Sequence, residues 1–111
     1  MSNKLNRLFK SIADPTRREI FSVLVLATTT LSITQIAERF DITRQGVTKH
    51  IMMLKEAGLI EISSEGREKF CRANPEPLKD IYEWVKFYER FWDDKLTGLG
   101  KYLDSKSNDK T

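Results

Sequence analysis

Apolar residues in the first part of the chain recur at the three- and four-residue spacing of amphipathic helices. The first group is Leu5, Leu8, Phe9 and Ile12; the second is Ile20, Val23, Leu24 and Ala27; the third is Ile33, Ile36, Ala37 and Phe40. Each group forms one apolar face of a helix. The pattern therefore predicts three successive helices that share a core.

Capping residues mark where the second and third helices begin. Asp14 is suited to an N-cap, and the following Pro15 is suited to the first position of a helix. Ser32 and Gln35 have the spacing of a capping box, in which each side chain bonds the backbone of the other residue. We therefore expect helices to start at these two places.

A very short break, residues 40–43, separates the third helix from a fourth. Thr43 is a suitable N-cap for the fourth helix, which continues to Ala57 and stops at Gly58. Two short helices joined by so tight a turn are typical of a helix-turn-helix.

A β-hairpin and a long helix complete the predicted order. Residues 59–63 and 67–73 are typical of two strands, joined by a turn that contains Gly66. Residues 74–77, which include two prolines, end the hairpin and start a final helix over residues 78–103. The order predicts a mainly α fold with a small β-hairpin, the winged helix-turn-helix (α-α-α-α-β-β-α), with the hairpin as the wing.

Length and composition limit the function classes. The chain of 111 residues has room for one domain, which we place at residues 1–103, followed by a polar, disordered tail over residues 104–111. No apolar run is long enough to span a bilayer, and no signal peptide is indicated. The single Cys71 cannot form an intrachain disulfide, which fits a reducing compartment. We expect a cytoplasmic protein without a membrane partner; the net charge of +3 alone says little about nucleic acid.

The outer face of the predicted fourth helix carries side chains suited to DNA. On a helical wheel, Val47, Ile51 and Leu54 lie on one side and are expected to pack on the preceding helices. The opposite side and its margins hold Arg44, Gln45, Thr48, Lys49, Met52 and Lys55. Residues 42–55 include no acidic side chain. Because Gln pairs with adenine, Arg with guanine, and Lys and Thr reach phosphates or base edges, we interpret this helix as a reader of double-stranded DNA; the alternative is an ordinary solvated face.

Other basic or polar residues of the domain are candidates for DNA contact, with a solvated surface as the alternative. In the wing, Arg67 and Lys69 are candidates for minor-groove or phosphate contact. Glu65 and Glu68 interrupt them, so a solvated hairpin is an equal alternative. Ser32, at the start of a helix, is a further candidate for phosphate contact.

Four other residues are assigned to no site. Arg17 and Arg18 open the second helix, where a surface role is favoured over phosphate contact. His50 lies near the apolar side of its helix, so packing or a structural hydrogen bond is favoured over catalysis. Cys71, in a predicted strand, is expected in the core rather than as a reactive thiol.

The chain contains, in order, the segments SIADPTRREI, LSITQIAERFDITRQGVTKHIMMLKEAGLIEI and EGREKFCRANPEPL. Over about residues 4–100 this combination resembles the ArsR-type winged-helix repressors of bacteria. The pairing of DPTRR with T-R-Q-x-V-T-K-H is more specific than either piece. The resemblance implies a homodimer built from the first and last helices, with Thr43, Arg44, Gln45, Thr48 and Lys49 in the DNA-reading positions.

The founding members of this family are metal sensors, and the chain departs from them at the metal-binding positions. Their third helix carries a cysteine-containing motif where this chain has residues 31–37, which contain no cysteine. Other members bind zinc with histidines and acids on the last helix, which here has no histidine. One Cys and one His do not furnish a zinc or soft-metal site of usual composition, so we predict no metal and no other cofactor.

Most aromatic residues of the chain lie in the predicted last helix. Its apolar stripe consists of Leu78, Ile81, Val85, Tyr88, Trp92, Leu99 and Leu103, widened by Trp84, Phe87 and Phe91. A helix this broadly apolar needs a second partner. We predict a dimer interface formed by Leu5, Leu8, Phe9, Trp84, Tyr88, Phe91, Trp92 and Leu99. The alternative is an aromatic pocket for a small organic effector.

The sequence thus favours a homodimeric transcriptional regulator, a repressor at a palindromic operator, over two other classes. One alternative is a protein-interaction module that has lost DNA binding and holds a partner protein with its aromatic helix. The acid-free face over residues 42–55 favours DNA, because a module freed from DNA has no need to keep it. An enzyme is disfavoured, because the chain has no glycine-rich phosphate loop and no paired His and Cys or Ser arrangement. Activation in place of repression, the operator and any inducer stay open.

Overall fold

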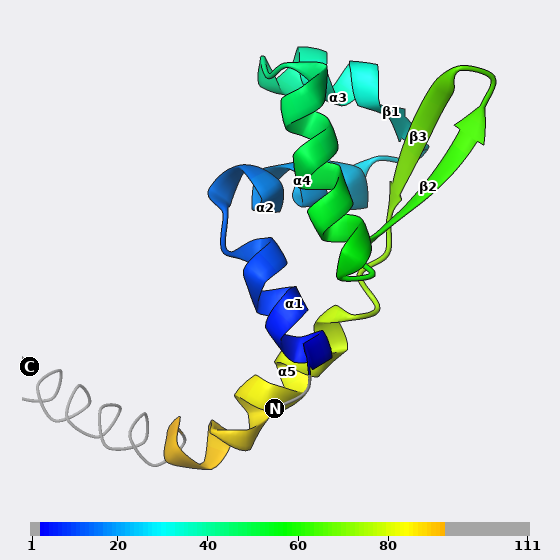
Figure 1. The fold of residues 1–111 in the computed structure, drawn as a ribbon. Coiled ribbons are helices and arrows are strands. Elements are labelled where there is room, and N and C mark those ends of the chain that lie inside the picture. Colours follow the sequence, from blue (N-terminus) through cyan, green and yellow to red (C-terminus); the bar gives the residue numbers. More distant parts are fainter. Residues whose placement is uncertain (1–2, 93–111) are drawn as a thin grey trace, which may run out of the picture. The chain divides into compact units, whose positions relative to one another are not determined.

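The computed structural model describes residues 3–92. The elements are α1 (Asn3–Ile12), α2 (Pro15–Leu26), β1 (Leu31–Ser32), α3 (Ile33–Phe40), α4 (Arg44–Glu56), β2 (Ile60–Glu65), β3 (Glu68–Ala73) and α5 (Leu78–Phe87) (Figure 1). The chain divides into two compact units, residues 1–81 and 82–111, and the boundary falls within α5. The predicted mainly α winged helix-turn-helix is confirmed.

The helices α2 and α3 begin where the sequence predicts, and each start is capped by a side chain. The carboxylate of Asp14 accepts a hydrogen bond from the backbone N of Arg17 at 2.9 Å. At the start of α3, Ser32 Oγ accepts from Gln35 N at 3.1 Å, while Gln35 Oε1 accepts from Ser32 N at 2.8 Å. These bonds satisfy backbone donors that have no partner inside the helix.

The turn between α3 and α4 depends on one residue with a left-handed backbone and on one close approach at a glycine. Asp41 ends α3 with φ 53°, in the left-handed region, and the backbone N of Ile42 donates to Ala37 O at 3.1 Å. Thr43 Oγ1 then accepts from Gly46 N at 3.1 Å and caps α4. At Gly46, a Cβ would lie 2.8 Å from Ile42 Cγ2, so the turn approaches α4 too closely for a larger residue.

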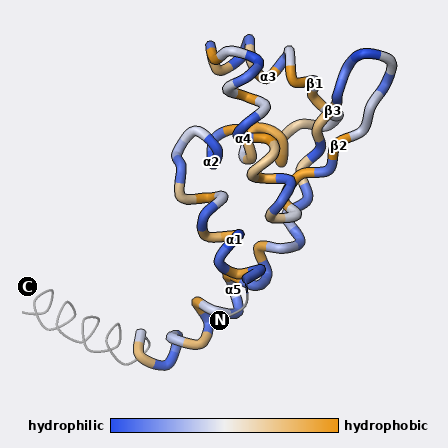
Figure 2. Tube along the Cα trace, in the orientation of Figure 1, coloured by the Kyte–Doolittle hydropathy of each residue, from blue (hydrophilic) through white to orange (hydrophobic). Residues whose placement is uncertain are grey.

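The core of the first unit forms around α4, which packs against α1, α2, α3 and β2. Its inaccessible side chains are Leu8, Ile20, Ile36, Val47, Ile51, Leu54, Leu59 and Cys71. Apolar stretches coincide with the packed segments, whereas the tip of the hairpin is hydrophilic (Figure 2). The predicted inner face of α4 and the core position of Cys71 are therefore confirmed.

The sheet has one strand more than the sequence predicts. Its order is β1-β3-β2, and β1 pairs antiparallel with β3 through Leu31 opposite Cys71 and Ser32 opposite Phe70. A strand of two residues is too short to show an alternating pattern, so only its pairing with β3 reveals it.

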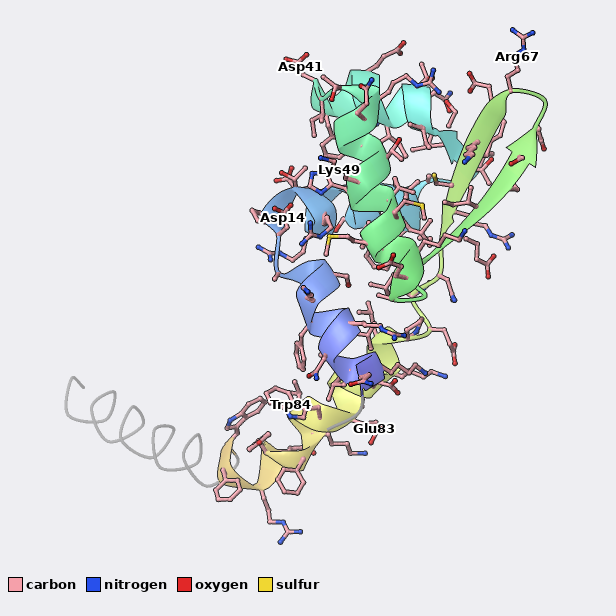
Figure 3. All side chains as sticks on the ribbon, in the orientation of Figure 1. Asp14, Asp41, Lys49, Arg67, Glu83 and Trp84 are labelled. Carbon is pink, nitrogen blue, oxygen red and sulfur yellow. The ribbon has the colours of Figure 1, made fainter. Side chains whose placement is uncertain are left out.

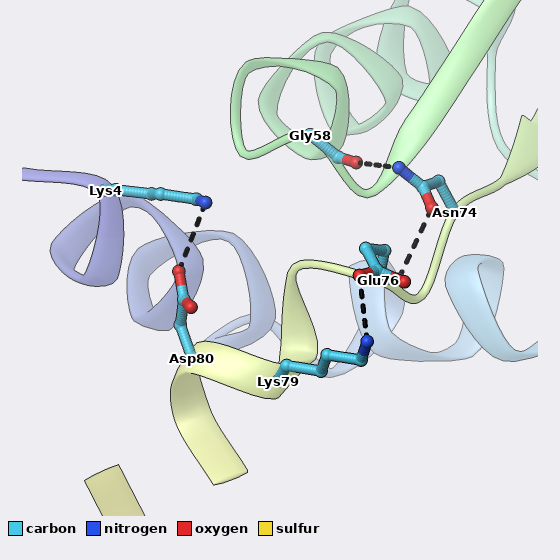
Figure 4. A network of polar contacts seen from close by, with 6 residues as sticks. All are labelled: Lys4, Gly58, Asn74, Glu76, Lys79 and Asp80. Atoms are coloured by element: carbon cyan, nitrogen blue, oxygen red, sulfur yellow. Dashed lines mark hydrogen bonds and ion pairs between the residues drawn. The ribbon is translucent and has the colours of Figure 1, made fainter. Parts of the chain in front are cut away.

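The segment after the hairpin fixes the start of α5. The backbone N of Asn74 donates to Leu59 O at 2.7 Å, and its side-chain Nδ2 donates to Gly58 O at 3.1 Å. Asn74 Oδ1 accepts from the backbone N of Glu76 at 3.3 Å (Figure 4). Lys4 Nζ lies 3.3 Å from Asp80 Oδ2, so the first turn of α5 is joined to α1. The predicted end of the hairpin over residues 74–77 is confirmed.

The prediction of an unbroken last helix is wrong at Tyr88. The backbone N of Tyr88 donates to Val85 O at 3.0 Å, a three-residue spacing that interrupts the α-helix, and the four-residue spacing returns where the backbone N of Trp92 donates to Tyr88 O at 3.3 Å. Aromatic side chains lose rotamer freedom in a helix, and this segment is rich in them. Residues 93–103 of the predicted helix, with Leu99 and Leu103, lie outside the described residues.

Candidate nucleic-acid interface

The two sides of α4 differ sharply in exposure. Val47, Ile51 and Leu54 are fully buried. The predicted DNA-reading side chains Arg44, Gln45, Thr48, Lys49, Met52 and Lys55 are all exposed. Figure 3 labels Lys49 about midway along the helix. The helix thus turns its apolar side to the core and leaves a side that is polar except for Met52 open to solvent.

The first two turns of α4 bring four of these side chains together. Arg44, Gln45, Thr48 and Lys49 line one open depression. Thr48 Oγ1 donates to Arg44 O at 2.8 Å, so its hydroxyl proton is held by the helix while its oxygen can still accept. Thr43 is exposed next to them and caps the helix. An amide, a guanidinium and an ammonium therefore project from neighbouring positions.

The positive charge of this face is not neutralised within the described chain. The ion pairs among residues 3–92 join Lys4 to Asp80, Arg72 to Glu61 and Lys79 to Glu76. Within the same residues, Arg44, Lys49 and Lys55 form none. Such unpaired cations on a protruding helix attract the phosphates of a nucleic acid.

The wing carries mixed charge. β2 and β3 pair from Ile60 opposite Ala73 to Glu65 opposite Glu68, so two acidic residues face each other next to the turn. Arg67 projects at the tip of the hairpin (Figure 3). Lys69 is exposed on β3. The two predicted basic residues are therefore accessible but sit among acidic neighbours.

Ser32 is placed differently from the other candidate contacts. It is only 3% exposed, it belongs to β1, and its hydroxyl already accepts the capping bond from Gln35. A hydroxyl this deeply buried is not accessible to a phosphate. We therefore leave Ser32 out of the candidate interface.

Arg17 and His50 form a contact that the sequence did not predict. Arg17 Nη1 lies 3.4 Å from His50 Nδ1 and joins the start of α2 to the middle of α4. The backbone N–H of Arg17, which bonds the Asp14 carboxyl, lowers the pKa of that carboxyl below its usual range, and the charge of the Arg17 guanidinium acts in the same direction. The DPTRR motif was the available signal, but two adjacent arginines do not reveal which one turns inward.

The predicted dimer residues fall into three groups. Leu5 and Leu8 lie on the buried side of α1 and so offer little surface to a second copy. Phe9 and Trp84 are half-buried. Tyr88, Phe91 and Trp92 are exposed, and Leu99 lies outside the described residues. Tyr82 and Phe87, which the sequence did not include, are 62% and 73% exposed.

Other chemistry is limited in the described part of the chain. Among residues 3–92, no three His, Cys, Asp or Glu side chains are arranged to hold a metal ion. Burial raises the pKa of the Cys71 thiol to about 11, which keeps it protonated and unreactive near neutral pH. Over the same residues, none of the helices combines the length and apolar character needed to cross a membrane.

Comparisons with known proteins converge on one family. Residues 12–63 match the family model of a helix-turn-helix domain. The chain is 33% identical over 81 residues to the transcriptional repressor SdpR of Bacillus subtilis. The aligned segment covers 73% of this chain and 88% of SdpR. The identity and coverage are high enough to establish common family membership.

Solved structures agree with the sequence comparison. An ArsR-like transcriptional regulator from Rhodococcus sp. RHA1 matches with a TM-score of 0.72 and 29% identity, over 92% of each chain. A homodimeric winged helix-turn-helix DNA-binding domain from Mycobacterium bovis, a possible ArsR-family regulator, matches with a TM-score of 0.62 and 22% identity, over 79% of this chain and 80% of that chain. These folds are those of transcription regulators and not of enzymes. The resemblance inferred from the sequence is confirmed, and the chain belongs to the ArsR-type family of winged helix-turn-helix, DNA-binding transcriptional regulators.

Proposed function

We propose that the protein is a homodimeric transcriptional repressor that acts in the cytoplasm and occupies a palindromic operator. The observation that carries this proposal is the exposed face of α4, where the unpaired cations Arg44, Lys49 and Lys55 lie with Gln45 and no acidic residue occurs from position 44 to 55. A helix of this kind fits the major groove, where base edges present donors and acceptors. The repressor role follows the kinship with SdpR, which is named a transcriptional repressor.

Two kinds of contact are proposed for α4. Arg44 and Gln45 lie in its first turn, nearest the bases in the usual docking of a recognition helix, and select sequence. Lys49 and Lys55 contribute mainly through phosphate charge. Met52 is 41% exposed on the same side and suits contact with a thymine methyl group.

The dimer is proposed to form through the first and last helices. Among residues 82–92, several large aromatic side chains are exposed, more than a monomeric surface usually carries. The similar fold from Mycobacterium bovis is homodimeric. Two copies related by a two-fold axis place their α4 helices about 34 Å apart, in successive major grooves.

The test is to sequence the fragments that the purified protein retains from the genome that encodes it. We expect a shared imperfect palindrome whose half-sites are centred about one helical turn, ~10 base pairs, apart. Placing the retrieved site over a promoter in a reporter strain then separates repression from activation. Retention of fragments without any shared site, at all salt concentrations, contradicts the proposal and favours a protein-interaction module.

A further inference from the structure

The side chain of Arg17 joins three helices of the first unit. It sits in the first turn of α2, where Nε donates to Ser11 O at 2.8 Å and Nη2 donates to Lys10 O at 3.2 Å, both at the C-terminal end of α1. Nη1 reaches His50 Nδ1 on α4 at 3.4 Å. One half-buried guanidinium therefore bridges α1, α2 and α4.

The α1 side of this bridge is rigid. The last carbonyls of a helix have no partner within the helix and lie at the negative end of its dipole, so a guanidinium is a favourable cap. Ser11 is 1% exposed, and its hydroxyl donates to Leu8 O at 2.8 Å. Because the planar guanidinium donates in fixed directions, bonds to two carbonyls hold it in one orientation.

On α4, the bridge contacts His50, a residue at the boundary between the buried and the exposed side of the helix. His50 is half-buried and lies between exposed Lys49 and fully buried Ile51. Successive residues differ by 100° around a helix, so fixing His50 fixes the direction in which the neighbouring outer face points. A guanidinium can only donate, so Nδ1 is the acceptor in the Arg17–His50 contact.

Arg18 provides a natural comparison. It follows Arg17 in the same motif, and its Nη1 donates to Ile12 O at 2.6 Å and Ala13 O at 3.2 Å. It thus also caps the end of α1, but from an exposed position, and within residues 3–92 its side-chain hydrogen bonds end there. The two arginines share charge and capping role and differ in the contact with α4.

We propose that Arg17 is a positioning residue for DNA recognition: by bonding the end of α1 and His50 together, it sets the angle at which α4 meets the major groove. This inference rests on the proposed role of α4 as the DNA-reading helix. Its three bonds direct the guanidinium into the chain, so Arg17 acts through α4 and does not neutralise a phosphate.

The experiment compares Arg17→Gln with the matched control Arg18→Gln, which removes the same charge. Both variants lose a cap of α1 and are measured where circular dichroism shows them folded. We expect Arg17→Gln to weaken binding to the retrieved operator about tenfold, within the range for coupled contacting residues. Arg18→Gln should stay within about twofold, and the salt slope of Arg17→Gln should equal that of Arg18→Gln.

A second variant keeps the inference testable if Arg17→Gln does not fold. His50→Gln leaves the Arg17 bonds to α1 in place and should weaken operator binding about as much as Arg17→Gln. The double variant should be no weaker than either single variant, because both remove the same link. Three results would overturn the inference. The first is an equal loss of operator binding for Arg17→Gln and Arg18→Gln, and the second is additive losses in the double variant. The third is a salt slope that falls by about one ion per subunit for Arg17→Gln alone.

Reference variants separate this inference from the proposed function. If Gln45→Ala and Lys55→Ala both bind like the parent, α4 does not read DNA and both proposals fail. If those two variants weaken binding while Arg17→Gln and His50→Gln do not, the proposed function stands and only the positioning role of Arg17 is wrong.

Discussion

An alanine at position 46 would be a better helix former than the glycine found there, yet the structure leaves no room for it. Its Cβ would lie 2.8 Å from Ile42 Cγ2 and 3.2 Å from Thr43 Oγ1, the atom that caps α4. Ordinary helix propensity favours alanine over glycine by about 1 kcal/mol. The tight turn before α4 outweighs this preference, because relieving the clash means moving Ile42 or breaking the cap.

We predict that Gly46→Ala destabilises the protein by about 1–3 kcal/mol, the usual range for overpacking. Urea denaturation at fixed protein concentration gives the free energy of unfolding. In an Ile42→Ala background, which removes the closer clashing methyl group, the same change should cost little or nothing. An equal cost in both backgrounds would show that the contact with Ile42 is not the cause.

Cys71 gives a prediction about alkaline stability. Its side chain is inaccessible, and burial raises the pKa of the thiol from 9.0 to about 11. Between these values the unfolded state loses the thiol proton while the folded state keeps it, so stability is complete below pH 9 and falls as the pH rises toward 11. We expect the parent to lose up to about 1.4 kcal/mol per pH unit more than Cys71→Ala in that range. Parallel pH profiles of the two proteins, from urea denaturation, would contradict this.

At the scale of elements, the sequence predicts what is decided locally. The capping box of Ser32 and Gln35 and the cap of Thr43 depend on residues three positions apart, so spacing alone identifies them. The inner and outer sides of α4 follow from periodicity in the same way. These features fix the helix-turn-helix and the exposed face of the candidate site.

Features that depend on partners distant in the chain escape such patterns. The two-residue β1 exists because Leu31 and Ser32 meet β3, about forty positions later in the sequence. The choice of Arg17, and not Arg18, to meet His50 depends on how α2 packs against α4. The end of α5 at Phe87 likewise has no glycine or proline to announce it.

The outer face of α4 supports a prediction that separates base reading from charge. Gln45→Ala should cost about 1–3 kcal/mol per half-site on the operator and little on random DNA, because an amide pair with a base is lost. Lys55→Ala should weaken both kinds of DNA alike and lower the salt slope by about one ion per subunit. Fluorescence anisotropy over a salt series measures both quantities. Parental binding by both variants at every salt concentration would refute the recognition role of α4.

At the scale of the whole molecule, the exposed aromatic residues of the last segment demand an explanation. Phe87, Phe91 and Trp92 are 73%, 61% and 48% exposed. Tyr88 makes edge-on ring contacts with Trp84 and Phe87, with centroids 5.3 and 5.1 Å apart. Side chains of this size are costly to leave in water, and clusters of them mark association surfaces. A second copy of the chain is the occupant that we propose for this surface.

We predict that the double variant Tyr88→Asp, Trp92→Asp is monomeric, because two carboxylates would have to be buried without partners in the proposed interface. Sedimentation velocity gives the assembly state, and circular dichroism shows whether the winged helix is still folded. Leu26→Asp is the matched control, since Leu26 is 82% exposed on α2 but lies outside the proposed interface, and this variant should remain dimeric. The monomer should also bind the palindromic operator much more weakly than the parent, because a single α4 reads only one half-site. A folded dimer that persists in the double variant, with parental affinity for the operator, would place the interface elsewhere on the molecule.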